Sequence, residues 1–328
     1  MKVLREHKVM NARNYKQLAY RIVGTLLLIC CLIPLGKIQP VFAAEKTHAK
    51  LRVGITLHPY YSFAINIVGD RAEVTPLIDA GFNPHNYVPK PDDMKRIMTL
   101  DALVVNGIGH DEWAFEILEA SGMKGKIPLI YANNGVALIP VAGEEGDTKV
   151  VNPHTFIATT AAIQQIYTIA KKLGEIDPPN AAYYSKNARA YALRLRRIKA
   201  EFMEKFSTLD VSHFRCATMH GAYGYLMQEF GLQVAAVIEP RHGVKPSPSQ
   251  LARTIDAIKA ADVSVLFAEK FFASKLADAI RKATGVRMYS FSHITGGEYE
   301  PEKFEREMRE NLKTLSTAIR SVSEESTR

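Results

Sequence analysis

The chain has 328 residues, of which 47% are hydrophobic and 23% are charged. This length allows two domains of ordinary size, and the sequence contains neither a low-complexity tract nor a repeat of solenoid period. The net charge of +8 does not indicate a nucleic-acid partner, because residues 1–43 hold seven Lys and Arg against one acidic residue, which leaves 35 basic and 33 acidic residues in the rest.

Residues 1–43 have the pattern of a secretory signal peptide. Basic residues come first, an apolar run from Ile22 to Leu35 follows, and small residues end the segment, so we expect cleavage after Ala43. The run of about 14 apolar residues is shorter than the roughly 20 of a membrane span. An uncleaved anchor and lipidation at Cys31 are the alternatives. Cys216 is the one cysteine of the exported part, and we expect it to be buried.

From residue 51 onward, short apolar strands alternate with helical patterns, which predicts a mainly parallel sheet covered by helices. The expected strands are 51–57, 73–78, 102–106 and 128–131, and the expected helices are 60–68, 92–100 and 111–120. A further helix is predicted over 155–173. The Asp177-Pro178-Pro179 segment then ends one helix and begins another.

The helix predicted over 180–207 is about 40 Å long at 1.5 Å per residue. Its apolar positions recur at spacings of four and three, which describes one continuous stripe: Tyr184, Ala188, Tyr191, Leu195, Ile198 and Phe202. The pattern after it repeats the first one, with strands expected over 214–219, 233–238, 263–267 and 286–291. We therefore predict an α/β protein with two lobes, 44–176 and 209–328, joined by a backbone helix over 177–208.

Histidines concentrate where parallel sheets bind ligands, in loops after strands or before helices. Seven of the nine histidines after residue 43 lie there: His58, His85, His110, His154, His220, His242 and His293. Neutral imidazole is the commonest metal ligand in proteins. Two such edges facing each other across a cleft would surround one ion, so the chain is first interpreted as a metal binder.

Local sequence ranks these histidines. His85 in GFNPHNYVP, His154 in VNPHTF and His220 in MHGAYGY lie in loops stiffened by Pro or Gly, which lowers the ordering cost of binding, although such loop histidines are usually surface residues. We interpret His110 as a solvated or helix-capping residue. His58 either reaches the cleft or orders its own loop. His242, between Arg241 and Lys245, is interpreted as a surface residue.

Six segments carry a resemblance to a known family: GFNPHNYVPKPDD (81–93), DALVVNGIGHDEW (101–113), NPHTF (152–156), MHGAYGYLMQEFGL (219–232), KPSPSQL (245–251) and LFAEKFFASKLADAI (266–280). Over residues 50–322 the chain resembles the zinc- and manganese-type periplasmic binding proteins of bacterial ABC importers. That resemblance implies two α/β lobes joined by a long helix. It also implies that His85, His154 and His220 are the first three metal ligands.

The fourth ligand position departs from the family pattern. Many relatives supply an aspartate there, whereas FSHITGGEY (291–299) offers His293; Glu269 is the reserve ligand, and water is the remaining option. His220 stands where manganese-type members carry a carboxylate, which favours Zn²⁺ over Mn²⁺. The segment VAGEEGDTK (141–149) lacks the histidine-rich insertion common in zinc-type relatives, so Mn²⁺ stays as the alternative.

The expected function is therefore that of a periplasmic receptor, not an enzyme. It would bind a divalent metal ion between its lobes, as a monomer with no nucleic-acid partner, and deliver the ion to an ABC transporter permease. A secreted zinc enzyme with Glu269 near the metal is the rival interpretation, against which stands the lack of an HExxH motif. An adhesin that shares the fold is the third.

Overall fold

The computed structural model describes residues 50–326, apart from positions 83, 141–149, 240–245 and 271–274. The chain divides by its contacts into residues 1–49 and residues 50–328, and everything below concerns the second unit. The predicted signal peptide and the loop of His242 lie outside the described residues.

The first half of this unit forms a parallel four-stranded sheet with the order β2-β1-β3-β4. Its strands are β1 (Leu51–Ile55), β2 (Ala72–Pro76), β3 (Ala102–Val105) and β4 (Leu129–Tyr131), and its helices are α2 (His58–Val68), α3 (Pro91–Ile97), α4 (Glu112–Ala120) and α5 (Thr159–Ile176). The chain passes from β1 to β2 on one side of it and then crosses to β3 on the other side. This reversal creates a switch point, where α/β sheets bind ligands at the carboxyl ends of their strands.

The second half repeats that arrangement, with the order β6-β5-β7-β8 and parallel pairing throughout. Its strands are β5 (Cys216–His220), β6 (Val234–Glu239), β7 (Val265–Glu269) and β8 (Arg287–Phe291), and its helices are α7 (Gly224–Glu229), α8 (Pro248–Ala260), α9 (Lys275–Thr284) and α10 (Lys303–Ser326). The predicted fold class, two α/β lobes with parallel sheets, is confirmed.

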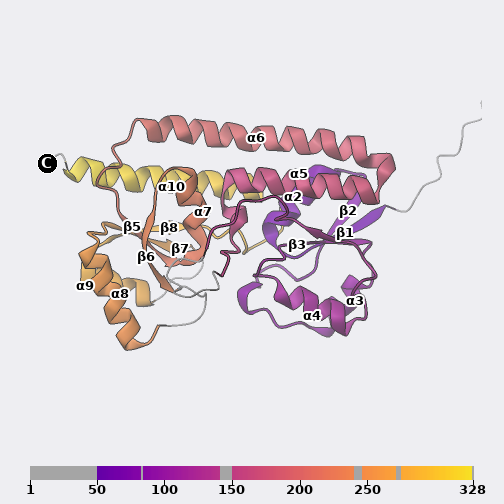
Figure 1. Ribbon diagram of the computed structural model, residues 1–328, viewed down its shortest axis with the longest axis horizontal. Coiled ribbons are helices and arrows are strands. Elements are labelled where there is room, and N and C mark those ends of the chain that lie inside the picture. The colour runs from indigo at the N-terminus through magenta and orange to yellow at the C-terminus, as the bar shows by residue number, and fades with distance from the viewer. Residues whose placement is uncertain (1–49, 83, 141–149, 240–245, 271–274, 327–328) are drawn as a thin grey trace, which may run out of the picture. The chain divides into compact units, whose positions relative to one another are not determined.

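Helices cover both faces of each sheet because strand side chains alternate between the faces. On β3, Val104 packs into the core that α2, α5 and α6 share, whereas Leu103 and Val105 pack toward α3 and α4. On β7, Phe267 and Leu266 divide in the same way, the latter toward α8 and α9. Figure 1 shows the resulting layers, with α5, α6 and α10 on one side of the sheets.

The long helix predicted between the lobes is α6 (Ala181–Ser207), with 27 residues. All six residues of its predicted apolar stripe are buried, with exposed fractions of 1% or less. They pack into the largest core cluster, which contains residues of both sheets and of α10. The helix therefore joins the two lobes through side-chain packing as well as through the chain (Figure 1).

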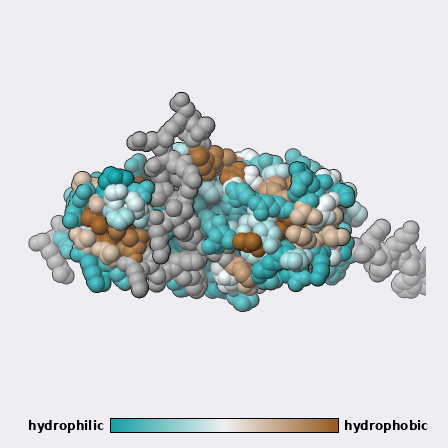
Figure 2. Space-filling view, turned by 90° about the horizontal axis from the view of Figure 1, so that it is seen from below, coloured by the Kyte–Doolittle hydropathy of each residue, from teal (hydrophilic) through white to brown (hydrophobic). Residues whose placement is uncertain are grey.

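The surface drawn in Figure 2 is mainly hydrophilic, with separate hydrophobic patches. Large exposed apolar side chains are scattered along the chain, at Phe82, Val88, Met98, Tyr131, Leu138, Val150, Leu193, Met203 and Val211. Cys216 is buried, as predicted. Within the part of the chain that the structure describes, none of the helices combines the length and the apolar character that crossing a bilayer requires.

Candidate metal centre

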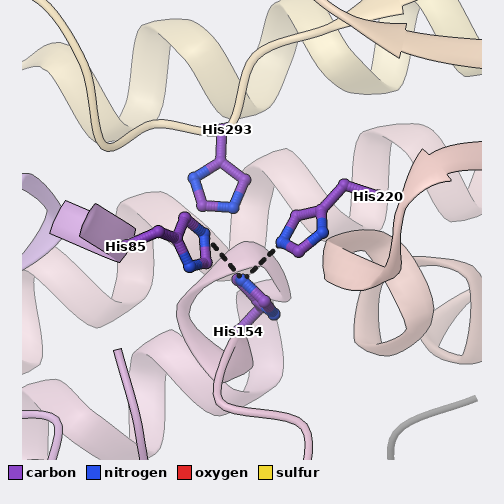
Figure 3. Close-up of side chains that lie close together, drawn as sticks. All are labelled: His85, His154, His220 and His293. Carbon is purple, nitrogen blue, oxygen red and sulfur yellow. Dashed lines mark hydrogen bonds between the residues drawn. The ribbon is translucent and has the colours of Figure 1, made fainter. Parts of the chain in front are cut away.

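Four of the predicted site histidines come together at the ends of the strands. His220 is the last residue of β5 and His293 follows β8, while His85 lies in the 3₁₀ turn η1 (Pro84–Asn86) and His154 directly precedes the 3₁₀ turn η2 (Thr155–Ile157). Each offers a ring nitrogen, and these four nitrogens all lie within 4.8 Å of one another. Figure 3 shows the rings facing a common centre, from segments far apart in the sequence.

The spacing of the nitrogens suits coordination of a single ion. Nε2 of His154 lies 3.1 Å from Nε2 of His220 and 3.5 Å from Nε2 of His85 (Figure 3). A tetrahedral zinc ion with Zn–N bonds of about 2.0–2.1 Å would place its ligand nitrogens about 3.3–3.4 Å apart. The His293 ring centre lies 5.0–5.7 Å from the ring centres of the other three, which lie 4.7–5.3 Å from one another.

Hydrogen bonds from the Nδ1 atoms of two of these histidines leave their Nε2 atoms unprotonated and directed toward the centre. Nδ1 of His220 lies 3.3 Å from the backbone oxygen of Glu239, which can only accept, so the Nδ1 proton points outward and Nε2 carries a lone pair. Nδ1 of His154 donates in the same way to Oδ1 of Asn152 at 2.8 Å. Two lone pairs aimed at one point repel each other unless a proton or a cation lies between them. This arrangement is the one that a metal ligand pair needs.

Asn152 also fixes the position of the His154 loop relative to β5. Its Oδ1 accepts a second hydrogen bond, from the backbone N–H of His154, and its Nδ2 donates to the backbone oxygen of Gly221 at 2.7 Å. One side chain thus connects the residue after His220 with the ring of His154. A neighbouring ligand pair held in this way loses little freedom when the ion binds.

The His293 loop is held by one face of α10. Asn311 accepts from the backbone N–H of Ser292 and donates to its carbonyl oxygen, at 2.7 and 2.8 Å. Glu307 accepts from the Ser292 hydroxyl and forms a buried ion pair with Lys303, with Nζ 2.6 Å from Oε1. His293 itself has Nδ1 2.6 Å from the hydroxyl oxygen of Thr295. The loop is therefore fixed at both its backbone and its side chains.

Burial keeps the imidazole of His154 neutral. The pKa of His154 is lowered well below its usual value, first by burial and then by the positive charge that His110, His220, His293 and His85 would carry. A neutral ring is the form that binds metal, and affinity falls when protons compete for it.

Glu269, the reserve ligand, is the last residue of β7 and is buried. Burial raises its pKa to about 8, with a contribution from the nearby charge of Glu239. It lines a cavity together with His293 and the 294–297 loop. Glu269 is not one of the four residues whose ligand atoms cluster within 4.8 Å, so it lies beside the histidine group rather than in it.

The interpretation of His110 as a solvated or capping residue is wrong. The residue is 5% exposed, the N-cap of α4 is Asp111, and the His110 ring centre lies 3.9 Å from that of His85. The residues that flank His110 do not predict its burial, because the rings around it come from other loops, those of His85, His154 and His293. The sequence signal was its place in the loop that follows β3, at the edge where parallel sheets bind ligands.

His58 orders a loop rather than joining the histidine group. Its Nε2 lies 2.7 Å from the carbonyl oxygen of Gly297, and its ring stacks on Tyr299 with centres 4.0 Å apart. Burial, with a smaller effect of the charge on Lys303, lowers its pKa to about 4. The side chain at the start of α2 thus contacts the segment that precedes α10.

Comparison with known proteins agrees with this architecture. A family model described as zinc-uptake complex component A, periplasmic, matches residues 53–318. The high-affinity zinc uptake system protein ZnuA of Bacillus subtilis is 26% identical over 280 residues, which cover 83% of this chain and 86% of that protein. The iron-binding protein YfeA of Yersinia pestis is 28% identical over 242 residues, covering 74% and 76%.

Solved structures give a higher identity. The solute-binding protein FpvC of Pseudomonas aeruginosa in complex with Mn²⁺ is 52% identical, with a TM-score of 0.80 over 83% of this chain and 99% of that one. Its complex with Ni²⁺ is also 52% identical, with a TM-score of 0.78 and coverage of 83% and 97%.

Two parallel α/β lobes with a buried imidazole group at the strand ends define a metal-binding solute-binding protein of an ABC importer, a class that binds its ligand without transforming it. The rival interpretation as a zinc enzyme is thereby set aside. The chain belongs to the family of the periplasmic component A of zinc-uptake complexes.

Proposed function

We propose that this protein binds one divalent ion through His85, His154, His220 and His293 and delivers it to the permease of an ABC importer. The observation that carries the proposal is the pair of Nε2 atoms of His154 and His220, 3.1 Å apart, whose Nδ1 atoms are both directed to oxygen acceptors. A structural hydrogen-bond network gives buried imidazoles separate partners, whereas a metal site directs their lone pairs to one point.

We propose Zn²⁺ as the ion, and Mn²⁺ as the alternative. Four neutral nitrogen donors suit the later first-row ions, whereas Mn²⁺ prefers oxygen ligands. Among the relatives, ZnuA is described as a zinc uptake protein, YfeA as iron-binding, and FpvC is found in complex with Mn²⁺ and with Ni²⁺. The relatives therefore support a divalent transition metal, and the donor chemistry supports zinc within that group.

We further propose that the protein reaches the periplasm by cleavage of residues 1–43 and acts there as a monomer. The lobes would span 44–176 and 209–328, with the linking helix at 177–208. The description of the matching family as periplasmic supports this location.

Isothermal titration of the metal-free protein with Zn²⁺, Ni²⁺ and Mn²⁺ tests the proposal. We expect one site per chain and tighter binding of Zn²⁺ than of Mn²⁺. His85→Ala, His154→Ala and His220→Ala should each weaken binding strongly while the circular dichroism of the metal-free protein stays unchanged. Unaltered affinity in all three variants would overturn the ligand assignment. Tighter binding of Mn²⁺ than of Zn²⁺ would overturn the choice of ion.

A further inference from the structure

A fifth buried imidazole, His110, packs against the ligand group without belonging to it. Its ring centre lies 3.9 Å from that of His85 at an interplanar angle of 32°, and 4.9 Å from that of His154. The four clustered ligand atoms come from His85, His154, His220 and His293. The His110 ring thus packs closely against the His85 ring at a tilt, and such a contact restrains the orientation of its neighbour.

The backbone of His110 is held in a conformation that histidine seldom adopts. Its φ is +85°, in the left-handed region, and the preceding Gly107 and Gly109 have φ of +72° and +108°. Glycine would adopt this conformation at lower cost, yet the position carries a large ring. Backbone strain of this kind persists only where the surroundings enforce it, and it concentrates at functional sites.

Two buried side chains enforce the conformation of this loop. The carboxylate of Asp111 accepts hydrogen bonds from the backbone N–H groups of Asn106 and Gly107, at 2.6 and 3.1 Å, and from Thr56 Oγ1 at 2.8 Å. Nδ2 of Asn106 donates to the carbonyl oxygen of Gly109 at 2.6 Å. The loop that bears His110 is therefore rigid.

The same Asn106 amide connects this loop to a ligand loop. Nδ2 of Asn106 lies 3.1 Å from the carbonyl oxygen of Pro153, the residue before His154. His110 is thus fixed relative to His154 through the backbone, and it contacts His85 through its ring. Of the four clustered histidines, His85 is the one that is only partly buried, so it is the ligand that gains most from a ring packed on its face.

We propose that His110 is a positioning residue of the metal centre, which holds the His85 ring in its coordinating orientation by packing against it. This inference rests on the proposed function, since it takes His85 as a ligand. It requires the flat ring of residue 110 and its rigid loop, but not its nitrogen atoms. Phenylalanine at this position should therefore preserve the affinity for the metal, whereas a small side chain should lower it.

The test compares His110→Ala with His110→Phe by calorimetric titration with Zn²⁺. We expect His110→Ala to raise the Kd by about 10- to 100-fold, the range seen when residues that orient metal ligands are removed, and His110→Phe to restore most of the lost affinity. The visible absorption of bound Co²⁺ should be the same in His110→Phe and in the unmodified protein, because the ligand set is unchanged. His110→Leu replaces the alanine variant if that one does not fold.

Two outcomes would overturn the inference. Unchanged affinity in His110→Ala would show that the stacked ring does not position His85. An equal loss in His110→Ala and His110→Phe would show that a nitrogen of His110 binds the metal. In the His85→Ala background, His110→Ala should cost nothing further. Normal binding in His85→Ala alone would instead contradict the proposed function, so the two failures are distinguishable.

Discussion

At the scale of single residues, the site depends on which nitrogen of each ring carries its proton. An imidazole has one donor and one acceptor nitrogen in its neutral form, and the outer acceptor decides which is which. The oxygens of Asn152 and Glu239 make that choice for His154 and His220. The ligand residues are thus specified partly by neighbours that do not touch the ion, a feature common to metal sites.

His293 should be the least costly ligand to remove. Its ring centre lies 5.0–5.7 Å from those of the other three, whereas those three lie 4.7–5.3 Å from one another, so its contacts are on average slightly longer. We expect His293→Ala to raise the Kd for Zn²⁺ by about tenfold, the lower end of the range of about 10- to 100-fold for residues that support metal ligands. His154→Ala should raise it by more than about 100-fold, beyond the upper end of that range. Titration calorimetry measures both, and an equal or larger loss for His293→Ala would reverse the ranking.

His58 should make the stability of the metal-free protein depend on pH. Its folded-state pKa is about 4, against about 6.5 in the unfolded chain, so its contribution to stability is complete above pH 6.5. As the pH falls from 6.5 toward 4, the unfolded ring binds a proton that the buried ring does not, and stability is lost. We expect a loss of about 2 kcal/mol from this group between pH 7 and pH 5.

Other buried groups also titrate in this range, so the measurement needs a matched variant. His58→Gln keeps a side-chain donor for the Gly297 carbonyl but does not titrate. The free energy of unfolding in urea, measured at pH 7 and pH 5, should fall by about 2 kcal/mol less in the variant. The same pH dependence in both proteins would contradict the assignment of a low pKa to His58.

At the scale of the element, α6 illustrates how one helix face can hold two lobes. Its buried stripe packs into the core cluster that contains residues of both sheets. Because the stripe runs without a break from Tyr184 to Phe202, the helix contacts both halves through one apolar face. A substitution in the middle of the stripe should therefore destabilise the whole unit.

Leu195 and Leu193 form a matched pair for this test. Both lie on α6, but Leu195 is 0% exposed whereas Leu193 is 46% exposed. We expect Leu195→Ala to lower the free energy of unfolding by about 2–5 kcal/mol and Leu193→Ala to change it by less than about 0.5 kcal/mol. Urea unfolding followed by circular dichroism measures both, and similar effects of the two substitutions would show that the stripe does not hold the lobes.

At the scale of the whole molecule, the two sheets have the same strand order, and the histidine group takes members from both halves. His85 and His154 come from the first half, whereas His220 and His293 come from the second. An ion bound by all four would link the two lobes directly. Binding would then stabilise the folded unit as a whole rather than one lobe.

A metal ion should accordingly raise the melting temperature of the protein. At a free Zn²⁺ concentration of about 100 times the Kd, binding adds about 2.7 kcal/mol, which corresponds to a rise of roughly 5–10 °C for a chain of this size. Differential scanning calorimetry with and without Zn²⁺ measures the rise, and His154→Ala serves as the control that should show little change. A single unshifted transition in the unmodified protein would contradict binding between the lobes.

The sequence by itself determined the alternation of strands and helices, the apolar stripe of α6 and the positions of His85, His154, His220 and His293 at loop ends, because periodicity and turn residues act over short distances. Only the tertiary structure decided which loops meet. The burial of His110 beside His85 and the contact of His58 with Gly297 join residues remote in sequence. No local pattern records such contacts, since they depend on how two sheets and a long helix pack together.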